Sequence, residues 1–137
     1  MRVVLDTNIF ISGFRSGGKP KIVLDMAFAG LYTLVASEEI LAEVEGVLSA
    51  KFGWPRPTVA STLKRVLSKA LLVRPTFRVA ECIDPDDNMI LEAALAGSAN
   101  FILSGDKHLL RMKTFRGIEI LTVGDFLLRT GAQLPSE

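Results

Sequence analysis

The sequence predicts an α/β protein with three layers, in which helices cover both faces of a central parallel sheet. Short apolar runs rich in β-branched residues alternate along the chain with longer segments of helical spacing. Strands that are buried on both faces form such near-continuous apolar runs, and the helices between them suit right-handed connections. We therefore expect one domain over residues 1–130, followed by a short tail at 131–137.

Each predicted strand is a short apolar run flanked by turn or helix-capping residues. These strands cover residues 2–5, 32–36, 101–103 and 118–121. The segments with helical spacing start at residue 19 or 20 and end at 29, then cover 38–50, 57–71, 86–96 and 123–129. Residues 16–18 form the loosest part between these elements.

Composition excludes several classes of protein. A chain of 137 residues with 49% hydrophobic residues can bury a core without disulfides or a structural metal. Its one cysteine, Cys82, cannot form an internal disulfide, and with the one histidine, His108, it cannot complete a zinc finger. Asp6 interrupts the first apolar stretch and Glu92 interrupts the run near residue 90. We therefore expect neither a signal peptide nor a membrane span, and a cytoplasmic protein.

A net charge of +1 hides a basic segment in the middle of the chain. Residues 51–78 contain seven basic side chains and no acidic one. Such a segment suits a polyanionic partner, although a solvated helix face that only aids solubility explains the same charges. The acidic residues elsewhere in the chain decide between these interpretations.

Acidic side chains fall where α/β proteins bind ligands, just beyond the carboxyl ends of strands. Asp6 directly follows the first predicted strand, and Asp106 lies just beyond the strand at 101–103. In the helix at 86–96, Asp87 shares an inward stripe with the apolar side chains, whereas Asp86 lies on the flank. These positions predict that Asp6 and Asp106 share one edge of the sheet, and they make Asp87 a better functional candidate than Asp86.

The helix at 38–50 supplies a further acid, but its periodicity leaves two choices. Glu43 and Glu45 lie just outside opposite borders of its apolar arc. Carboxylates gathered at one partly buried place repel one another and lose hydration, so they require a neutralising cation. Oxygen ligands without histidine or thiolate favour Mg²⁺ or Mn²⁺, an ion that supports phosphodiester hydrolysis.

Four segments of this chain resemble the PIN-domain nucleases, particularly the small prokaryotic toxins of the VapC-like kind. Each segment is short, and their order and spacing over nearly the whole chain carry the resemblance. They are residues 4–10 (VLDTNIF), 37–44 (SEEILAEV), 84–88 (DPDDN) and 102–110 (ILSGDKHLL).

The resemblance implies which residues form the site and what the site does. It assigns the acidic metal site to Asp6, Glu43, Asp87 and Asp106, and it favours Glu43 over Glu45. It also implies that Asn8 and Ser104 support these acids by hydrogen bonding. The implied activity is that of a metal-dependent endoribonuclease, in which water attacks the phosphodiester to leave 5′-phosphate and 3′-hydroxyl ends. The implied partners are RNA, a cognate antitoxin protein and a second copy of the chain in a homodimer or higher homo-oligomer.

The predicted helix at 57–71 gives the basic segment a meaning under this resemblance. Its apolar side chains form one face and leave Lys64, Arg65 and Lys69 outward. Because the apolar face is modest and suits the core, we expect these three cations to contact RNA rather than a membrane. Trp54 and Tyr32 could stack on bases, but loop packing and strand burial, respectively, are simpler explanations.

Two further interpretations compete with a nuclease. A nonhydrolytic RNA-binding or assembly domain would use the same fold and the same basic segment. A P-loop-like nucleotide-binding protein would use residues 13–19, whose spacing matches that motif up to Lys19. Pro20 replaces the required Ser or Thr, however, and Gly13 lies seven positions after Asp6 rather than at the end of the strand.

Overall fold

The structure is a computed structural model that describes residues 1–82 and 84–131. Its centre is a six-stranded sheet with the order β3-β2-β1-β4-β6-β5. The strands are β1 (Arg2–Leu5), β2 (Thr33–Ser37), β3 (Leu71–Val73), β4 (Phe101–Leu103), β5 (Thr114–Phe115) and β6 (Ile118–Leu121). All neighbouring strands are parallel except β5, which pairs antiparallel with β6 at the edge. The predicted parallel sheet is therefore confirmed, with one short antiparallel edge strand added.

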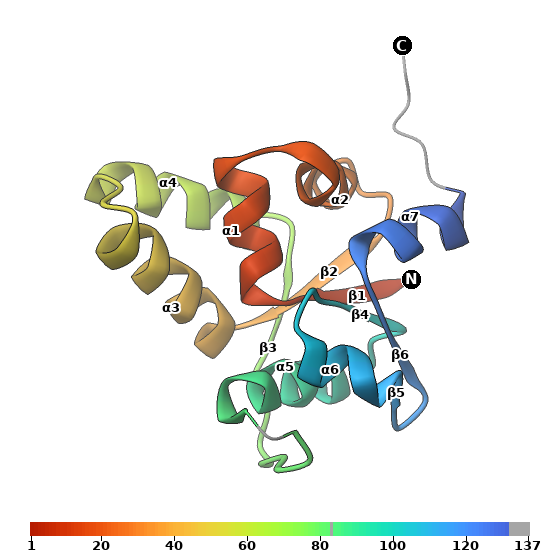
Figure 1. Cartoon of the computed structure of the whole chain (residues 1–137). Helices are drawn as coiled ribbons and strands as arrows, with labels where there is room; N and C mark the ends of the chain where they lie inside the picture. Colours follow the sequence, from red (N-terminus) through yellow and green to blue (C-terminus); the bar gives the residue numbers. More distant parts are fainter. Residues whose placement is uncertain (83, 132–137) are drawn as a thin grey trace.

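Helices cover both faces of this sheet, as Figure 1 shows. Helices α1 and α2 lie on one face with α7, whereas α5 and α6 lie on the other; α3 and α4 form a pair beside them. The helices are α1 (Thr7–Arg15), α2 (Gly18–Phe28), α3 (Glu38–Gly46), α4 (Arg56–Leu67), α5 (Pro85–Ala96), α6 (Lys107–Met112) and α7 (Val123–Thr130). Helix α3 continues into a π-helical turn, η1 (Val47–Lys51). The three-layer α/β/α architecture is thus confirmed.

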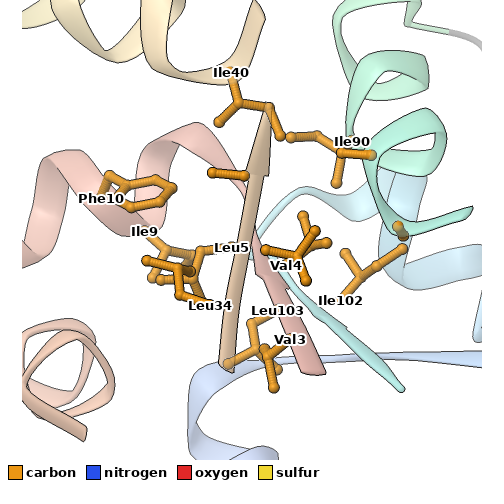
Figure 2. Packing of buried hydrophobic residues seen from close by; sticks show 14 of the residues in the cluster. Val3, Val4, Leu5, Ile9, Phe10, Leu34, Ile40, Ile90, Ile102 and Leu103 are labelled. Atoms are coloured by element: carbon orange, nitrogen blue, oxygen red, sulfur yellow. The ribbon is translucent and has the colours of Figure 1, made fainter. Parts of the chain in front are cut away.

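The core forms on both sides of β1 because successive side chains of a strand point to opposite faces. Val4 lies toward Ile90 of α5, whereas Leu5 lies toward Ile9 and Phe10 of α1 (Figure 2). All five side chains are buried. Burial on both faces explains why β1 is an uninterrupted apolar run rather than an alternating one.

Helix α1 was missing from the sequence-based prediction. Its residues include β-branched side chains and Gly13, all weak helix formers. Tertiary packing compensates for them: a Cβ atom on Gly13 would stand 2.3 Å from Cδ1 of Leu24, so glycine lets α2 pack closely against α1. Because Gly13 lies inside a helix, residues 13–19 do not form the strand-to-helix loop of a nucleotide-binding P-loop.

The predicted helix at 57–71 was too long. Helix α4 ends at Leu67, and the chain turns and enters β3 at Leu71, which pairs with β2. Local propensity cannot reveal this boundary, because a three-residue strand is defined by its neighbour in the sheet. Helix α6 and strand β5 were missed because each is too short, at six and two residues, to show a periodic pattern. The predicted tail at 131–137 lies outside the described residues except for Gly131.

No helix among the described residues combines the length and apolar character that a bilayer crossing requires.

Candidate active site

Ser104 connects two of the predicted acids at the carboxyl ends of β1 and β4. Its hydroxyl donates to Oδ2 of Asp6 over 2.7 Å and accepts from the backbone N–H of Asp106 over 2.9 Å. The backbone N–H of Asp6 in turn donates to the carbonyl of Leu103 over 2.9 Å. Ser104 is fully buried, so these hydrogen bonds fix Asp6 and Asp106 relative to the sheet.

Asp106 also caps the N-terminus of helix α6. Its Oδ1 accepts hydrogen bonds from the backbone N–H groups of His108, over 2.7 Å, and Leu109, over 3.4 Å. This is the usual arrangement of an aspartate at a helix N-terminus, where the backbone donors stabilise negative charge. The cap therefore accounts for one oxygen of Asp106 and holds the carboxylate in place.

Asp87 lies in the first turn of α5 and is buried, whereas its neighbour Asp86 is exposed, as the helical spacing predicts. Burial raises the pKa of Asp87 to about 7, with further increases from the carboxylates of Asp106, Asp6 and Asp84 and from hydrogen bonding to Asp106. These increases place Asp6, Asp87 and Asp106 within electrostatic reach of one another.

Asp6 responds to the same surroundings. Burial raises its pKa, the hydrogen bond from Ser104 partly offsets that increase, and Asp106 adds to it. Asp6 and Asp87 thus both have pKa values that are raised by burial first and by neighbouring carboxylates second, which indicates a site with excess negative charge. A cation bound among these groups would relieve both the repulsion and the loss of hydration.

Two other predicted site residues, Glu43 and Asn8, have fewer recorded interactions with the three aspartates. Glu43 is partly buried on α3, and no hydrogen bond or ion pair of the described residues joins it to the three aspartates. Glu45, the other acid that the helical spacing allowed, is exposed and lines the hollows between α3 and α4. Asn8 is exposed; its backbone N–H lowers the pKa of Asp6, while its side chain forms no hydrogen bond with the described residues.

Sequence reasoning gave no role to Asn88 or Cys82, although both adjoin Asp87. The Asn88 side chain accepts from the backbone N–H of Cys82 over 2.9 Å and donates to its carbonyl over 3.1 Å. The Cys82 thiol in turn lies 3.8 Å from Oδ2 of Asp87 and donates to it. Asn88 stands beside the acids of the 84–88 segment, and that position was the only available signal.

The donor atoms of this site suit a hard divalent cation. Across residues 1–82 and 84–131, no set of three or more His, Cys, Asp or Glu side chains is arranged so that it could hold a metal ion. Mg²⁺ and Mn²⁺ do not require such a set, since proteins hold them through one or two carboxylates and otherwise through water. Asp6 and Asp106, which Ser104 fixes side by side, are the residues that best fit this requirement.

The structure divides the basic segment into paired and unpaired cations. Arg74 pairs with Glu38 over 3.2 Å, and Arg78 lies 3.8 Å from Glu39 and 3.6 Å from the buried Glu92. These carboxylates neutralise both arginines, so the two contribute less to the attraction of a polyanion.

The three predicted RNA contacts belong to the unpaired group. Lys64, Arg65 and Lys69 are exposed and have no ion pair with a described residue. The Arg65 guanidinium lies 4.0 Å from the centre of the Phe28 ring, which holds the cation against α2.

A parallel sheet with carboxylates at its strand ends defines an α/β protein with an acidic site, and comparison with known proteins supplies the family. The model of the PIN domain family matches residues 2–108, so the chain belongs to the PIN domain family. The family predicted from the sequence is therefore confirmed. No curated protein matches the chain.

Among solved structures, the chain is similar to the crystal structure of VapBC2 from Rickettsia felis bound to a DNA fragment from their promoter. The TM-score is 0.62 and the sequence identity is 18%, over 88% of this chain and 97% of the other. At this identity the similarity shows a shared fold.

Proposed function

We propose that this protein is a metal-dependent endoribonuclease whose active site is formed by Asp6, Glu43, Asp87 and Asp106. Membership of the PIN domain family makes a nuclease the natural activity for this fold. The observation that carries the proposal is the raised pKa of Asp87, about 7, which is caused first by burial and then by the carboxylates of Asp106 and Asp6. Perturbed carboxyl groups of this kind are typical of catalytic sites.

The roles follow from how each residue is held. Asp6 and Asp106 would hold Mg²⁺ or Mn²⁺ directly, while Glu43 and Asp87 would bind the same ion or orient its water ligands. Such an ion lowers the pKa of a bound water and offsets charge on the phosphate oxygens. Ser104 fixes Asp6 and Asp106 relative to each other, and the raised pKa of Asp87, about 7, leaves this carboxyl group only partly ionised at neutral pH in the metal-free protein.

The substrate we propose is RNA, held by the unpaired cations Lys64, Arg65 and Lys69. Backbone phosphates are recognised by such exposed basic side chains without regard to sequence. We also propose that residues 1–130 form one nuclease domain.

The family and the fold suggest a physiological setting. We propose that the protein is the toxin of a type II toxin-antitoxin module, acts in the cytoplasm, pairs with a cognate antitoxin and forms a homodimer or higher homo-oligomer. Support comes from the similarity in fold to the VapBC2 structure.

The test is cleavage of a defined RNA by the wild type and by Asp6→Asn, with Mg²⁺ or with EDTA. We expect metal-dependent cleavage that the substitution reduces by at least about 100-fold, as is typical when a charge-stabilising group is removed from an active site. Asp86→Asn is the matched control, because it removes an exposed carboxylate beside the site. Cleavage that persists in EDTA and in Asp6→Asn would contradict the mechanism. RNA binding without cleavage in any metal would favour a nonhydrolytic RNA-binding or assembly domain.

Metal binding also predicts a thermal shift. Because Mg²⁺ would bind only the folded protein, it should raise the Tm of the wild type. Asp6→Asn should lose most of that increase, whereas Asp86→Asn should keep it. Differential scanning calorimetry over a range of Mg²⁺ concentrations measures the shift. An equal increase in all three proteins would assign the effect to nonspecific binding.

A further inference from the structure

Helix α1 connects the acidic site to a second feature of the surface. Asp6 precedes the first residue of α1, and Arg15 is the last. Nine helical residues span roughly 14 Å. At the far end, the Arg15 guanidinium lies 3.6 Å from the centre of the Phe52 ring. The end of α1 that lies away from the acidic site therefore contacts the turn between η1 and α4 through Arg15.

Two aromatic rings, Phe52 and Trp54, lie between two cations, Lys51 and Arg56, along this turn. Lys51 lies 5.5 Å from the centre of the Phe52 ring, and Trp54 and Arg56 follow within four residues. Arg15, Lys51 and Arg56 are exposed and have no ion pair with a described residue. This turn therefore keeps its positive charge available, unlike the paired positions further along the chain.

The surface is hollowed beside Trp54. A hollow of about 550 Å³ is lined by Ala42, Glu45, Gly46, Ser49, Trp54, Arg56 and Val59. Its size falls within the range of small-molecule sites, about 300–1,000 Å³. Trp54 is only partly buried, so part of its ring is open to this space. Ser49 and Glu45 also line this hollow. The Ser49 hydroxyl donates to the backbone carbonyl of Glu45 over 2.8 Å, so its oxygen and the Glu45 carboxylate can act as acceptors for a planar heterocycle.

We propose that this turn is a binding subsite for single-stranded RNA that flanks the cleaved phosphate. A base stacks on Trp54 in the hollow, while Arg15, Lys51 and Arg56 contact the phosphates on either side. Stacking on an aromatic side chain combined with a basic surface is the general way in which proteins hold single strands. Glu45 repels phosphate and accepts hydrogen bonds from base N–H groups, which orients the base inward and the backbone toward Arg56.

The proposal rests on the proposed ribonuclease function and adds the path of the bound RNA, which extends from the acidic site to the turn before α4. It predicts that the enzyme prefers RNA long enough to reach from the acidic site to the turn. A dinucleotide can occupy the acidic site but cannot span the length of α1.

The first test uses Trp54 as a reporter, because it is the only tryptophan of the chain. Single-stranded RNA is titrated into full-length protein in EDTA, and tryptophan fluorescence is followed together with the anisotropy of end-labelled RNA. We expect quenching of Trp54 emission with the same midpoint as the anisotropy change. Anisotropy that rises while Trp54 emission stays constant would overturn the proposal and leave the ribonuclease function intact.

The second test compares a dodecamer with a dinucleotide as substrates for Trp54→Ala and Arg56→Ser. Loss of one stacking contact or one phosphate contact should raise KM for the dodecamer by roughly 10-fold, and so narrow the preference over the dinucleotide. Arg74→Ser is the matched control, because that arginine belongs to the same basic segment but is paired with Glu38. An unaltered preference in both variants would refute the subsite. Arg56 is exposed, so its variant decides the question if Trp54→Ala fails to fold.

Two other outcomes separate the proposals. RNA that is neither bound nor cleaved by the wild type would refute the ribonuclease function and the subsite together. Quenching of Trp54 by a protein partner but not by RNA would refute the subsite alone, and would assign the turn to protein recognition.

Discussion

Asp87 is a single carboxyl group on which burial and three neighbouring carboxylates act together, and this makes stability depend on pH. The pKa of Asp87 is about 7 in the folded protein and near 3.8 when solvated. Between these values the folded protein holds a proton that the unfolded chain has lost, so the free energy of unfolding decreases as pH rises. Above pH 7 the carboxylate is charged in both the folded and the unfolded state, so the free energy of unfolding no longer changes with the ionisation of Asp87.

We therefore predict that Asp87→Asn stabilises the metal-free protein at pH 8 by on the order of 1–2 kcal/mol, given about 1.4 kcal/mol per pKa unit and partial screening by solvent. At pH 4 the gain should be much smaller. Urea denaturation in EDTA at both pH values measures the difference. Asp86→Asn is the control. Since Asp86 is exposed, this substitution should hardly alter the difference in the free energy of unfolding between pH 4 and pH 8. Equal stability changes at the two pH values would contradict the electrostatic explanation.

At the same scale, the sequence located the acids better than it located their contacts. The inward position of Asp87 follows from helical spacing, and Asp6 and Asp106 follow from their places after strands. The resemblance named Ser104 as a hydrogen-bonding support of the acids. Which groups its hydroxyl joins could not be derived from the sequence, because Asp6 and Ser104 are separated by 98 positions and meet only when β1 pairs with β4. The two hydrogen bonds between the Asn88 side chain and the backbone of Cys82 likewise depend on how the chain enters α5.

The elements pack at distances that certain glycines make possible. Gly97, at the end of α5, lies against β2, and a Cβ atom there would stand 2.5 Å from Cγ1 of Val35. Val35 is fully buried and cannot move aside freely. We predict that Gly97→Ala lowers the free energy of unfolding by about 1–3 kcal/mol, the usual cost of overpacking a core.

Gly46 provides the matched comparison. It lies in α3 with helical backbone angles, and nothing stands within 4 Å of its Cβ position. Gly46→Ala should therefore raise the free energy of unfolding by about 0.5–1 kcal/mol, because alanine restricts the unfolded chain and favours the helix. Urea denaturation of both variants measures the two signs. The packing interpretation fails if Gly97→Ala is as stable as the wild type.

The sequence predicted those elements whose pattern is complete within one segment of the chain. Helix α5 begins at an aspartate cap with proline in its first turn, and β1 is a continuous apolar run. Helix α1 and strand β3 depend instead on partners: α1 requires the close approach of α2 at Gly13, and β3 requires the edge of β2. No local pattern contains that information.

Over the whole molecule, charge is separated rather than balanced. Asp6 and Asp106 lie at the carboxyl ends of β1 and β4, whereas the unpaired cations of residues 51–69 lie on α4 and in the turns before and after it. A single-stranded polyanion can meet both regions only if its backbone follows the cations while one phosphate enters the acidic site. The salt dependence of RNA binding tests this arrangement, because each phosphate contact releases counterions.

We predict that joint reversal of Lys64, Arg65 and Lys69 to glutamate weakens RNA binding and reduces the slope of log affinity against log salt by about 2, given about 0.7 per contact with a single strand. The matched control reverses Arg74, Arg116 and Arg129, which produces the same net charge at positions already paired with carboxylates. Anisotropy titrations over a range of salt concentrations measure both slopes, and the Mg²⁺-dependent Tm increase should persist in each variant. If the slope decreases equally in the two variants, net charge alone attracts the RNA, and Lys64, Arg65 and Lys69 have no special part in binding.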